Sequence, residues 1–404
     1  MLWQFSPAID RLRANEIREL LKLIEQPDII SFAGGIPSSE HFPVAVMSEV
    51  MIDLMSDDTL ARSSFQYSAS EGYPPLRAWI VEWLRRGGVA RSLDEVLITS
   101  GSQQALDLLG RCFLGPDDPV AVPRPCYLGA LQVFGTHTSQ LIDLKSDAEG
   151  PCPDALTAAF RDGARLLYLN PDFANPSGET ISLPRRRALI EVVALQGGLI
   201  IEDTPYRELR YDGDAVPTMA ALEQERSNSG ANQSSCVVQL GSFSKTLAPG
   251  MRVGWVSGHA QIIAKLVLLK QAADLHTPTF NQIVMHRLAQ RVFDAQVTTM
   301  CGVYHERRDA MLAALELASS RHVSWSLPSG GMFLWLKFAN EIDTRHLLER
   351  SIREIRVAFV PGSAFYPRDA PTNFARLSFS SVSPDQIHEG IRRLMALTSS
   401  SMPR

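Results

Sequence analysis

The sequence predicts an α/β protein made of a large domain with a mostly parallel central sheet and a smaller α+β domain. Two observations predict this fold class. Between about residues 95 and 256, short apolar runs alternate with helical segments, a pattern typical of a parallel sheet covered by helices on both faces. After a long helical stretch from about residue 262 to 315, the order of the runs changes. The 404 residues leave room for more than one hydrophobic core.

The strands of the large domain are predicted at five short apolar runs that end in polar residues. In chain order these runs lie in EVLITSG (95–101), PVAVPRP (119–125), RLLYLNP (165–171), LIIEDTP (199–205) and VVQLGSFSKT (237–246). Helices are predicted at 102–114, 127–135 and 183–197. Because active sites of parallel sheets lie at the carboxyl ends of the strands, the polar residues after these runs are expected to meet at one edge of the sheet.

The smaller domain is predicted from four segments near the C-terminus. GGMFLWLKF (330–338) and ARLSFS (375–380) are typical of strands, and TRHLLERSIRE (344–354) and PDQIHEGIRRLMAL (384–397) are typical of helices. These elements do not continue the strand-helix alternation of the large domain, so they indicate a separate α+β unit.

Composition excludes several classes of protein. With 45% hydrophobic residues, 21% charged residues and a net charge of −5, the chain has no strong field of one sign for nucleic acid or an anionic membrane. No stretch approaches the ~20 apolar residues of a membrane span, and the charged N-terminal segment lacks the apolar core of a secretory signal. The cysteines are expected to be reduced core residues of a cytoplasmic protein, with no metal site, because five of them lie scattered without CxxC spacing or nearby histidines.

One lysine stands among small and hydroxylated residues in GSFSKTLAPGMRVGW (241–255). A nucleotide-binding P-loop needs glycine directly before the lysine and again five residues before that, but Ser244 and Gln239 occupy those positions. A second interpretation makes Lys245 a nucleophilic amine, while Ser242, Ser244 and Arg252 bind a phosphate group. Pyridoxal phosphate needs both, since its aldehyde condenses with a lysine and its phosphate needs hydrogen-bond donors. An ordinary surface turn with a solvated lysine is the competing interpretation.

The other parts of a pyridoxal phosphate site are present at neighbouring strand ends. Asp203 ends an apolar run and suits the carboxylate that keeps the pyridine nitrogen protonated. Tyr206 and Asn175 suit the groups that donate to the phenolate oxygen, and Tyr127 suits the aromatic face against the ring. Each of these residues alone is also explained by a helix cap, a turn or a partly buried core position.

The phosphate group is expected at the N-terminus of the helix predicted from residue 102, where free N–H groups and the helix dipole favour an anion. Ser102 and Gln103 open this helix. It is the joint occurrence of these residues at successive strand ends, with Lys245 last, that favours the cofactor site.

The same residues also resemble a known family. Over nearly the whole chain, the sequence resembles the fold-type I pyridoxal phosphate aminotransferases of class I/II. The motifs that carry this resemblance are SGSQQAL, NPDFANPSG, IIEDTPYREL, GSFSKTLAPGMRVGW and ARLSFS. IRELLKL, SFAGGIPSSEHFP, QYSASEGYPPLR and KQAADLHTPTFNQ are similar to the 2-aminoadipate, kynurenine and lysine-biosynthesis branch. The resemblance implies the aspartate aminotransferase-like fold. Residues 1–44 would form an N-terminal helix and a substrate-covering loop that pack with the small domain, 45–290 the large domain and 291–404 the small domain.

The resemblance also implies a role for each site residue. Lys245 would form the Schiff base and carry the proton between the substrate Cα and the C4′ atom of the cofactor. Asp203 would pair with the pyridine nitrogen, and Tyr206 and Asn175 would hold the phenolate oxygen. The implied phosphate ligands are Ser102, Gln103, Ser242, Ser244 and Arg252, with Tyr127 stacked on the ring.

Further residues are implied in substrate binding and assembly. Tyr67 matches a tyrosine that reaches the phosphate of the neighbouring subunit, which implies a homodimer with shared sites. Arg376 matches the arginine that grips the α-carboxylate, a role that suits its planar fork; the structural alternative is a strand residue paired with an acid. Arg18 matches an arginine that reaches a distal carboxylate, with a solvated helix residue as its alternative. Gly35, in the covering loop, and Asn175 are expected beside the substrate.

Two positions differ from the usual sequence pattern of the family. Ser177 stands where threonine is common and keeps the hydroxyl group. Ala174 stands where a larger polar residue often precedes the asparagine, and this change is expected to open space beside the cofactor.

The implied activity is ping-pong amino transfer between a dicarboxylic amino acid, such as glutamate or 2-aminoadipate, and a 2-oxo acid such as 2-oxoglutarate. Aromatic or large aliphatic donors would bind when Arg18 swings away. The same lysine, aspartate and tyrosine also serve lyases, decarboxylases and oxidative cyclases of this fold, which stay open as alternatives. A DNA-binding regulator is disfavoured by the absence of a basic stripe, and an inactive scaffold by the presence of Lys245 with Asp203 and Arg252.

Overall fold

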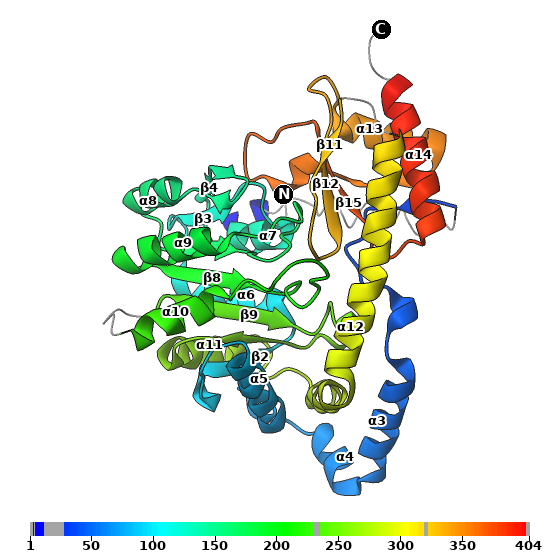
Figure 1. Cartoon of the computed structure of the whole chain (residues 1–404). Coiled ribbons are helices and arrows are strands. Elements are labelled where there is room, and N and C mark those ends of the chain that lie inside the picture. The colour runs from blue at the N-terminus through cyan, green and yellow to red at the C-terminus, as the bar shows by residue number, and fades with distance from the viewer. Residues whose placement is uncertain (1–2, 4, 12–27, 230–234, 319–321, 401–404) are drawn as a thin grey trace.

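The computed structural model describes residues 3, 5–11, 28–229, 235–318 and 322–400. Figure 1 shows a large domain of sheet and helices beside a smaller domain, with one long helix running along both. Among the described helices, none is both long and apolar enough to cross a membrane.

The large domain is built on a seven-stranded sheet in the order β2-β10-β9-β8-β7-β3-β4. Its strands are β2 (Val96–Thr99), β3 (Val120–Pro123), β4 (Leu141–Leu144), β7 (Leu166–Leu169), β8 (Leu199–Asp203), β9 (Val237–Ser242) and β10 (Gly254–Ser257). All neighbouring pairs are parallel except the two that β10 makes with β2 and β9. The mostly parallel sheet is confirmed, and all five predicted runs form strands of it.

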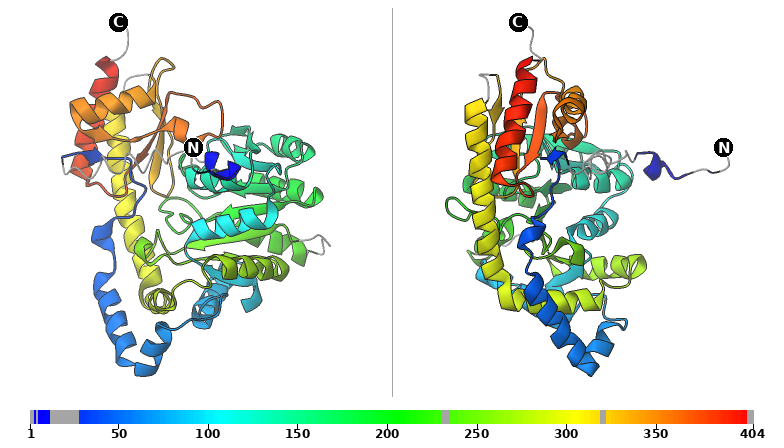
Figure 2. Two further views of the ribbon diagram at one scale, coloured as in Figure 1. Left: turned by 180° about the vertical axis from the view of Figure 1, so that it is seen from behind. Right: turned by 90° about the vertical axis from the view of Figure 1, so that its right-hand side faces the viewer.

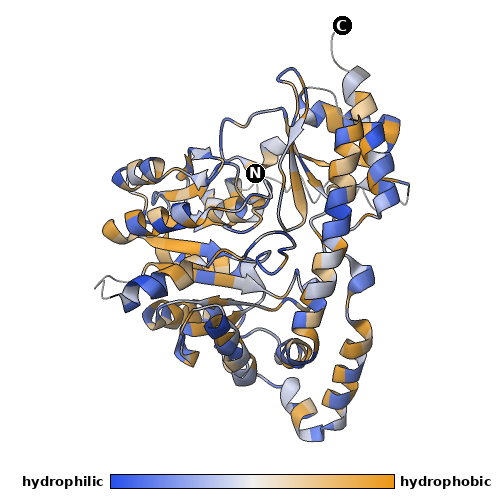
Figure 3. Ribbon diagram, in the orientation of Figure 1, coloured by the Kyte–Doolittle hydropathy of each residue, from blue (hydrophilic) through white to orange (hydrophobic). Residues whose placement is uncertain are grey.

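Helices cover both faces of this sheet. They are α5 (Pro74–Arg86), α6 (Ser102–Phe113), α7 (Leu128–His137), α8 (Pro153–Arg161), α9 (Leu183–Leu195), α10 (Met219–Asn228) and α11 (Ala260–Ala273). Successive residues of β8 enter opposite cores: Leu199 and Ile201 pack in the cluster with α6, α7 and α11, and Ile200 packs in the cluster with α5, α8, α9 and α10. Each such buried aliphatic side chain contributes about 1.5–3 kcal/mol relative to exposure. Figure 3 shows the resulting apolar strands between helices of mixed polarity.

The smaller domain is an antiparallel sheet with helices. Its strand order is β11-β12-β15-β14, from β11 (Ser324–Trp325), β12 (Phe333–Lys337), β14 (Val360–Pro361) and β15 (Phe374–Ser378). The helical elements are α13 (Thr344–Arg350), a π-helical turn (Ser351–Ile355), a 3-10 turn (Gly362–Phe365) and α14 (Pro384–Ser400). The four segments predicted for this domain all lie in these elements.

The N-terminal region joins both domains. It contains α1 (Pro7–Asp10), β1 (Ile30–Ser31), a 3-10 turn (Ser39–His41), α3 (Val44–Ser56) and α4 (Asp58–Ser64). Strand β1 pairs in parallel with β13 (Val357–Ala358) of the small domain, so residues 28–36 are held beside the small sheet. Short elements β5 (Ser146–Asp147), β6 (Gly150–Pro151) and the 3-10 turns Leu93–Glu95 and Pro249–Met251 complete the described chain.

The helical stretch expected from about residue 262 to 315 is two helices, because α11 ends at Ala273 and α12 runs from Thr279 to Ala318. Pro278 disfavours helical geometry in the residue before it, and Leu275 lies in the left-handed region at φ 63°. The first half of α12 packs in the large-domain core and its second half in the small-domain core. Figure 2 shows α12 and α14 side by side.

Candidate active site

Lys245 lies just after β9, in the turn that the sequence singled out. Its Nζ atom donates to the carbonyl oxygen of Gly35 at 2.8 Å and lies 5.7 Å from the ring centre of Tyr206. Burial, together with the charges of Arg376 and Arg252, lowers the pKa of Lys245 to about 8. An amine with this pKa is neutral far more often at physiological pH than a solvated lysine, which suits a nucleophile and a base.

This pKa sets an expected pH dependence for cofactor attachment to the cofactor-free protein. Only the neutral amine attacks an aldehyde, so the rate of attachment at Lys245 is expected to rise as the pH increases and to level off above a pH of about 8. Stopped-flow absorbance of pyridoxal phosphate mixed with cofactor-free protein measures this rate. A rate that still rises with a midpoint near the ordinary lysine pKa of about 10.4 would contradict the assignment.

Asp203 ends β8 and presents an unsatisfied oxygen atom. It is buried, its Oδ2 atom accepts from the hydroxyl of Tyr168 at 3.0 Å, and Asn170 donates to its backbone oxygen at 2.8 Å. The buried Oδ1 atom has no hydrogen-bond partner among the described residues, which costs about 1–3 kcal/mol. Burial raises the pKa of Asp203 to about 7. A ring nitrogen that brings its own proton would satisfy Oδ1 and favour the ionised carboxylate, so this residue fits a pyridine ring.

Tyr206, Asn175 and Arg376 form one chain of hydrogen bonds beside Lys245. The amide nitrogen of Asn175 donates to the Tyr206 hydroxyl at 3.4 Å, and Nη1 of Arg376 donates to the Asn175 amide oxygen at 2.9 Å. Tyr206 is buried, so its hydroxyl group stays protonated and can donate to an anionic oxygen. The structure thus brings Tyr206 and Asn175 together, and their role toward a phenolate oxygen stays a prediction.

Arg376, on β15, is a buried cation without an acidic partner among the described residues. Its Nη2 atom donates to the Ala33 carbonyl at 2.7 Å, while its buried Nε atom has no partner. The guanidinium lies 4.5 Å from the ring centre of Phe333 and 5.2 Å from that of Phe365. Burial lowers the pKa of Arg376 to about 10, which still leaves it charged at neutral pH. The paired-strand alternative for this residue is therefore not observed, and a buried guanidinium of this kind fits a carboxylate ligand.

The predicted phosphate ligands gather at the N-terminus of α6. The residue before this helix is Gly101, at φ 84°, and a Cβ atom there would lie 2.5 Å from Nη2 of Arg252. Arg252 is left-handed at φ 52°, and its Nη1 atom lies 3.5 Å from Oγ of Ser244. The hydroxyl of Ser242 in turn donates a hydrogen bond to the hydroxyl of Ser244 at 2.9 Å. Because Gly101 cannot cap α6 with a side chain, the first N–H groups of the helix have no capping side chain and are available to an anion.

The side chains of Gln103 and Tyr127 form a hydrogen bond with each other. The Tyr127 hydroxyl donates to the Gln103 amide oxygen at 3.4 Å, and the Gln103 amide nitrogen donates to Gly129 at 3.1 Å. Burial raises the pKa of Tyr127 to about 12, and Asp203 adds to the shift. Tyr127 lines the same pocket as Tyr168 and Asn170, the two residues that hydrogen-bond Asp203, and its stacking on the ring stays a prediction.

Two predicted residues are not placed in this cluster. Tyr67 is 78% exposed, and its ring meets that of His276 edge-on at 6.0 Å. Arg18 lies outside the described residues. The sequence assigned no role to Tyr168 and Asn170, which both hydrogen-bond Asp203. Asn170 directly follows β7, so its position after an apolar strand was an available signal, whereas Tyr168 lies inside the strand and gave none.

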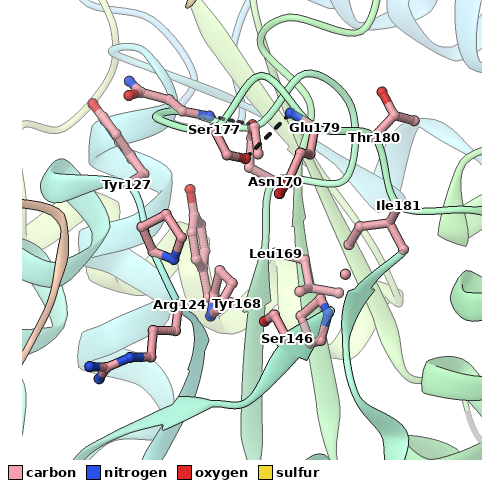
Figure 4. A pocket seen from close by; sticks show the side chains of 16 residues that line it. Arg124, Tyr127, Ser146, Tyr168, Leu169, Asn170, Ser177, Glu179, Thr180 and Ile181 are labelled. Atoms are coloured by element: carbon pink, nitrogen blue, oxygen red, sulfur yellow. Dashed lines mark hydrogen bonds between the residues drawn. The ribbon is translucent and has the colours of Figure 1, made fainter. Parts of the chain in front are cut away.

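A pocket adjoins the site, and Tyr127, Asn170 and Asn175 are among the residues that line it. Figure 4 shows Tyr127 and Tyr168 on one side of it and Thr180 and Ile181 on the other. Ala174 also lines it, so the small residue at this position does border open space. Among the described residues, no group of His, Cys, Asp and Glu side chains is arranged to hold a metal ion.

The strand ends of the large sheet, with Lys245 and Asp203, meet Arg376 of the small domain through Asn175. This fold and this arrangement of side chains indicate a pyridoxal phosphate-dependent aminotransferase of fold type I. The comparisons agree with this class. The chain belongs to the family described as aminotransferase class I and II, which matches residues 27–394, and its cofactor is pyridoxal 5′-phosphate.

The relatives place the chain in one branch of that family. It is 40% identical over 391 residues to the 2-aminoadipate transaminase of Thermus thermophilus, covering 96% of this chain and 95% of the relative. It is 39% identical over 398 residues to aromatic-amino-acid aminotransferase 1 of Thermococcus litoralis, covering 96% and 93%. The crystal structure of Pyrococcus horikoshii kynurenine aminotransferase with PMP has a TM-score of 0.91 at 39% identity, covering 99% of this chain and 98% of that one. The resemblance to the 2-aminoadipate and kynurenine branch is confirmed.

Proposed function

We propose that this aminotransferase moves amino groups between a dicarboxylic L-amino acid, such as glutamate or 2-aminoadipate, and a 2-oxo acid such as 2-oxoglutarate, by a ping-pong mechanism. Aromatic or large aliphatic amino acids are secondary donors. The observation that carries the amino-acid part of the proposal is the buried Arg376 guanidinium, which lacks an acidic partner among the described residues and hydrogen-bonds Asn175. The dicarboxylic preference depends on the expected role of Arg18 and on the names of the relatives. Relatives named for 2-aminoadipate, aromatic amino acids and kynurenine support this substrate range.

Arg376 would bind the α-carboxylate of the substrate. Its Nε and Nη atoms form a planar fork that matches a carboxylate, and the aromatic rings of Phe333 and Phe365 fix the plane of that fork. The Ala33 carbonyl and Asn175 hold the other donors. The α-carbon is thereby fixed in one place relative to the neighbouring lysine.

Lys245 would move the proton. In its neutral form the Nζ atom would accept the proton from the substrate α-carbon, and the ammonium group so formed would deliver a proton to the C4′ atom of the cofactor. Pyridoxal phosphate, when bound, supplies a ring that accepts the electron pair left on that carbon. Asp203 would keep a proton on the pyridine nitrogen of the cofactor, and Tyr206 and Asn175 would donate to its phenolate oxygen. The carbonyl of Gly35 holds Nζ on the side of the covering loop.

The assembly and domain limits belong to the same proposal. Tyr67 is exposed within one chain, so it is free to reach the phosphate of the other subunit in a homodimer. The proposed domains are 1–44, 45–290 and 291–404; helix α12 crosses the last limit and contributes to both cores. A cytoplasmic location also stays a proposal. The relatives reported above are named as aminotransferases, and no observation favours the lyase, decarboxylase or cyclase alternative.

A half-reaction titration tests the proposed activity. Glutamate added to the holoenzyme is expected to convert the cofactor absorbance to that of the amino form, with one equivalent of 2-oxoglutarate released. Added 2-oxoglutarate is expected to restore the original absorbance.

Replacing Arg18 with alanine is expected to weaken the binding of glutamate and 2-aminoadipate while leaving the binding of leucine unchanged. Ammonia release without recovery of the amino form would contradict transamination, and unchanged glutamate kinetics in the Arg18 variant would contradict the dicarboxylate assignment.

Replacing Arg376 with leucine is expected to remove α-carboxylate binding. Truncating one partner of a buried charge pair costs about 2–5 kcal/mol, so kcat/KM is expected to fall roughly 30-fold to several-thousand-fold. The loss should be the same for every amino acid, because all share the carboxylate. Arg393, on the far helix α14, provides the matched arginine-to-leucine control, and a variant whose loss differed between glutamate and leucine would point instead to side-chain recognition.

A further inference from the structure

Lys270 is a fully buried lysine in the last turn of α11 that the proposed mechanism does not use. Its Nζ atom donates to the amide oxygen of Gln104 at 2.7 Å, to both carboxylate oxygens of Asp274 at 2.9 and 3.0 Å, and to the hydroxyl of Thr277 at 3.2 Å. A buried ammonium group is expensive to desolvate. All its hydrogen-bonding capacity is directed at one small region, the start of α6 and the segment after α11.

The acceptors of Lys270 hold the backbone that begins α6. Gln104 accepts from the backbone N–H of Ser100 at 2.8 Å and donates to Asp274 at 2.6 Å. The hydroxyl of Ser100 donates to the same Asp274 oxygen at 3.2 Å and lies 3.2 Å from the Thr277 hydroxyl. Ser100 is thus fixed at its backbone nitrogen and at its side chain.

Ser100 in turn connects to the phosphate cradle. Its carbonyl oxygen accepts from Nη2 of Arg252 at 3.4 Å, and the residues that follow it are Gly101 and Ser102, where α6 begins. A Cβ atom at Gly101 would already collide with Arg252, so small shifts of this backbone change the shape of the cradle. Figure 2 shows α6 and α11 next to each other on the same side of the sheet.

We propose that Lys270 is a positioning residue for the phosphate group of the cofactor: through Gln104 and Asp274 it fixes Ser100, and thereby the N–H groups at the start of α6 and the Arg252 guanidinium. Lys270 does not itself touch the phosphate. It also neutralises Asp274, whose carboxylate would otherwise stand unpaired behind an anion-binding helix end. This inference rests on the assignment of the phosphate site in the proposed function.

A purely structural role is a weaker explanation of this lysine. Replacing a buried ion pair with apolar residues of similar volume is often neutral or stabilising, so packing alone does not require a charge at this position. Methionine has a similar length, and the Asp274 carboxylate that Lys270→Met leaves behind is 31% exposed. Water can therefore solvate this carboxylate in part, and the variant is expected to fold. What it loses is the connection between α11 and Ser100.

The experiment compares two ligands that differ only in the phosphate group. The affinities of pyridoxal 5′-phosphate and pyridoxal are measured by equilibrium dialysis against full-length protein freed of cofactor. Lys270→Met is expected to weaken the affinity for pyridoxal phosphate by roughly 10- to 100-fold, the range that loss of an outer contact causes at metal sites. The affinity for pyridoxal is expected to stay unchanged. Gln104→Leu, on a less buried side chain, is expected to show the same selective loss. Lys265→Met, exposed on the same helix, is the matched control and is expected to bind both ligands normally.

Each outcome decides between a failure of this inference and a failure of the site assignment. If Lys270→Met and Gln104→Leu weaken both ligands equally, or neither, the positioning role is overturned. Arg252→Ala is measured alongside them. If Arg252→Ala selectively loses affinity for pyridoxal phosphate while the other variants do not, only Lys270 is misassigned. If Arg252→Ala shows no selective loss of affinity, the phosphate site itself is misassigned.

Discussion

Replacing Lys245 with alanine is expected to abolish covalent attachment of the cofactor and to reduce amino transfer by at least about 1000-fold. The structure gives two reasons. Nζ of Lys245 is the amine with a lowered pKa beside Arg376 and Tyr206, so the variant loses both the nucleophile and the group that moves the proton. General acid–base catalysis alone contributes roughly 10²–10⁴-fold. The fold should persist, since the side chain contributes one hydrogen bond, to Gly35.

Borohydride reduction followed by mass spectrometry of peptides measures the attachment, and single-turnover kinetics measure the transfer. The wild-type protein is expected to carry the reduced cofactor on the peptide that contains Lys245, and the variant on no peptide. Lys265→Ala, exposed on α11, serves as the control for loss of a lysine. A variant that still traps the cofactor at another lysine, with turnover retained, would show that Lys245 has been misassigned.

The sequence predicts the large sheet well where a strand is apolar on both faces. β7, β8 and β9 lie inside the sheet and read as continuous apolar runs, so both their existence and their ends are apparent. β4 was not predicted because it is an edge strand, only partly buried and interrupted by Asp143. β10 was missed because it follows directly on the lysine turn, begins with glycine and runs antiparallel, which breaks the strand-helix alternation on which the prediction depended.

The site shows the same limit in a different form. Residues at strand ends were found because topology alone brings strand ends together, and the structure places Lys245, Asp203 and Asn175 at one edge of the sheet. Their roles toward the cofactor stay predictions. Residues that act through others were not found: Tyr168 is recognisable only when its hydroxyl is seen 3.0 Å from Asp203, and Lys270 only when its four hydrogen bonds are seen. Such contacts depend on packing between elements distant in sequence, which local patterns do not encode.

Replacing Asp203 with asparagine is expected to leave the cofactor bound but to lower kcat by at least about 100-fold. An amide is the same size as the carboxylate and can keep the hydrogen bond with Tyr168, so the fold and the ring position should persist. It carries no charge, however, and cannot favour a proton on the ring nitrogen that faces Oδ1. Loss of one preorganised group of this kind costs roughly 10²–10³-fold in kcat.

The matched control for Asp203 is its neighbour on the same strand. Glu202 is equally buried, but its carboxylate accepts from the backbone N–H groups of Met219 and Ala220 at 2.6 and 3.1 Å, on the other face of the sheet. Glu202→Gln is therefore expected to change the free energy of unfolding and to leave kcat near the wild-type value. Cofactor content, measured by absorbance after denaturation, separates loss of binding from loss of chemistry. If Asp203→Asn kept its cofactor and its wild-type kcat, the assignment of Asp203 as the carboxylate that keeps the ring nitrogen protonated would be wrong. The unsatisfied Oδ1 atom would then need a different ligand.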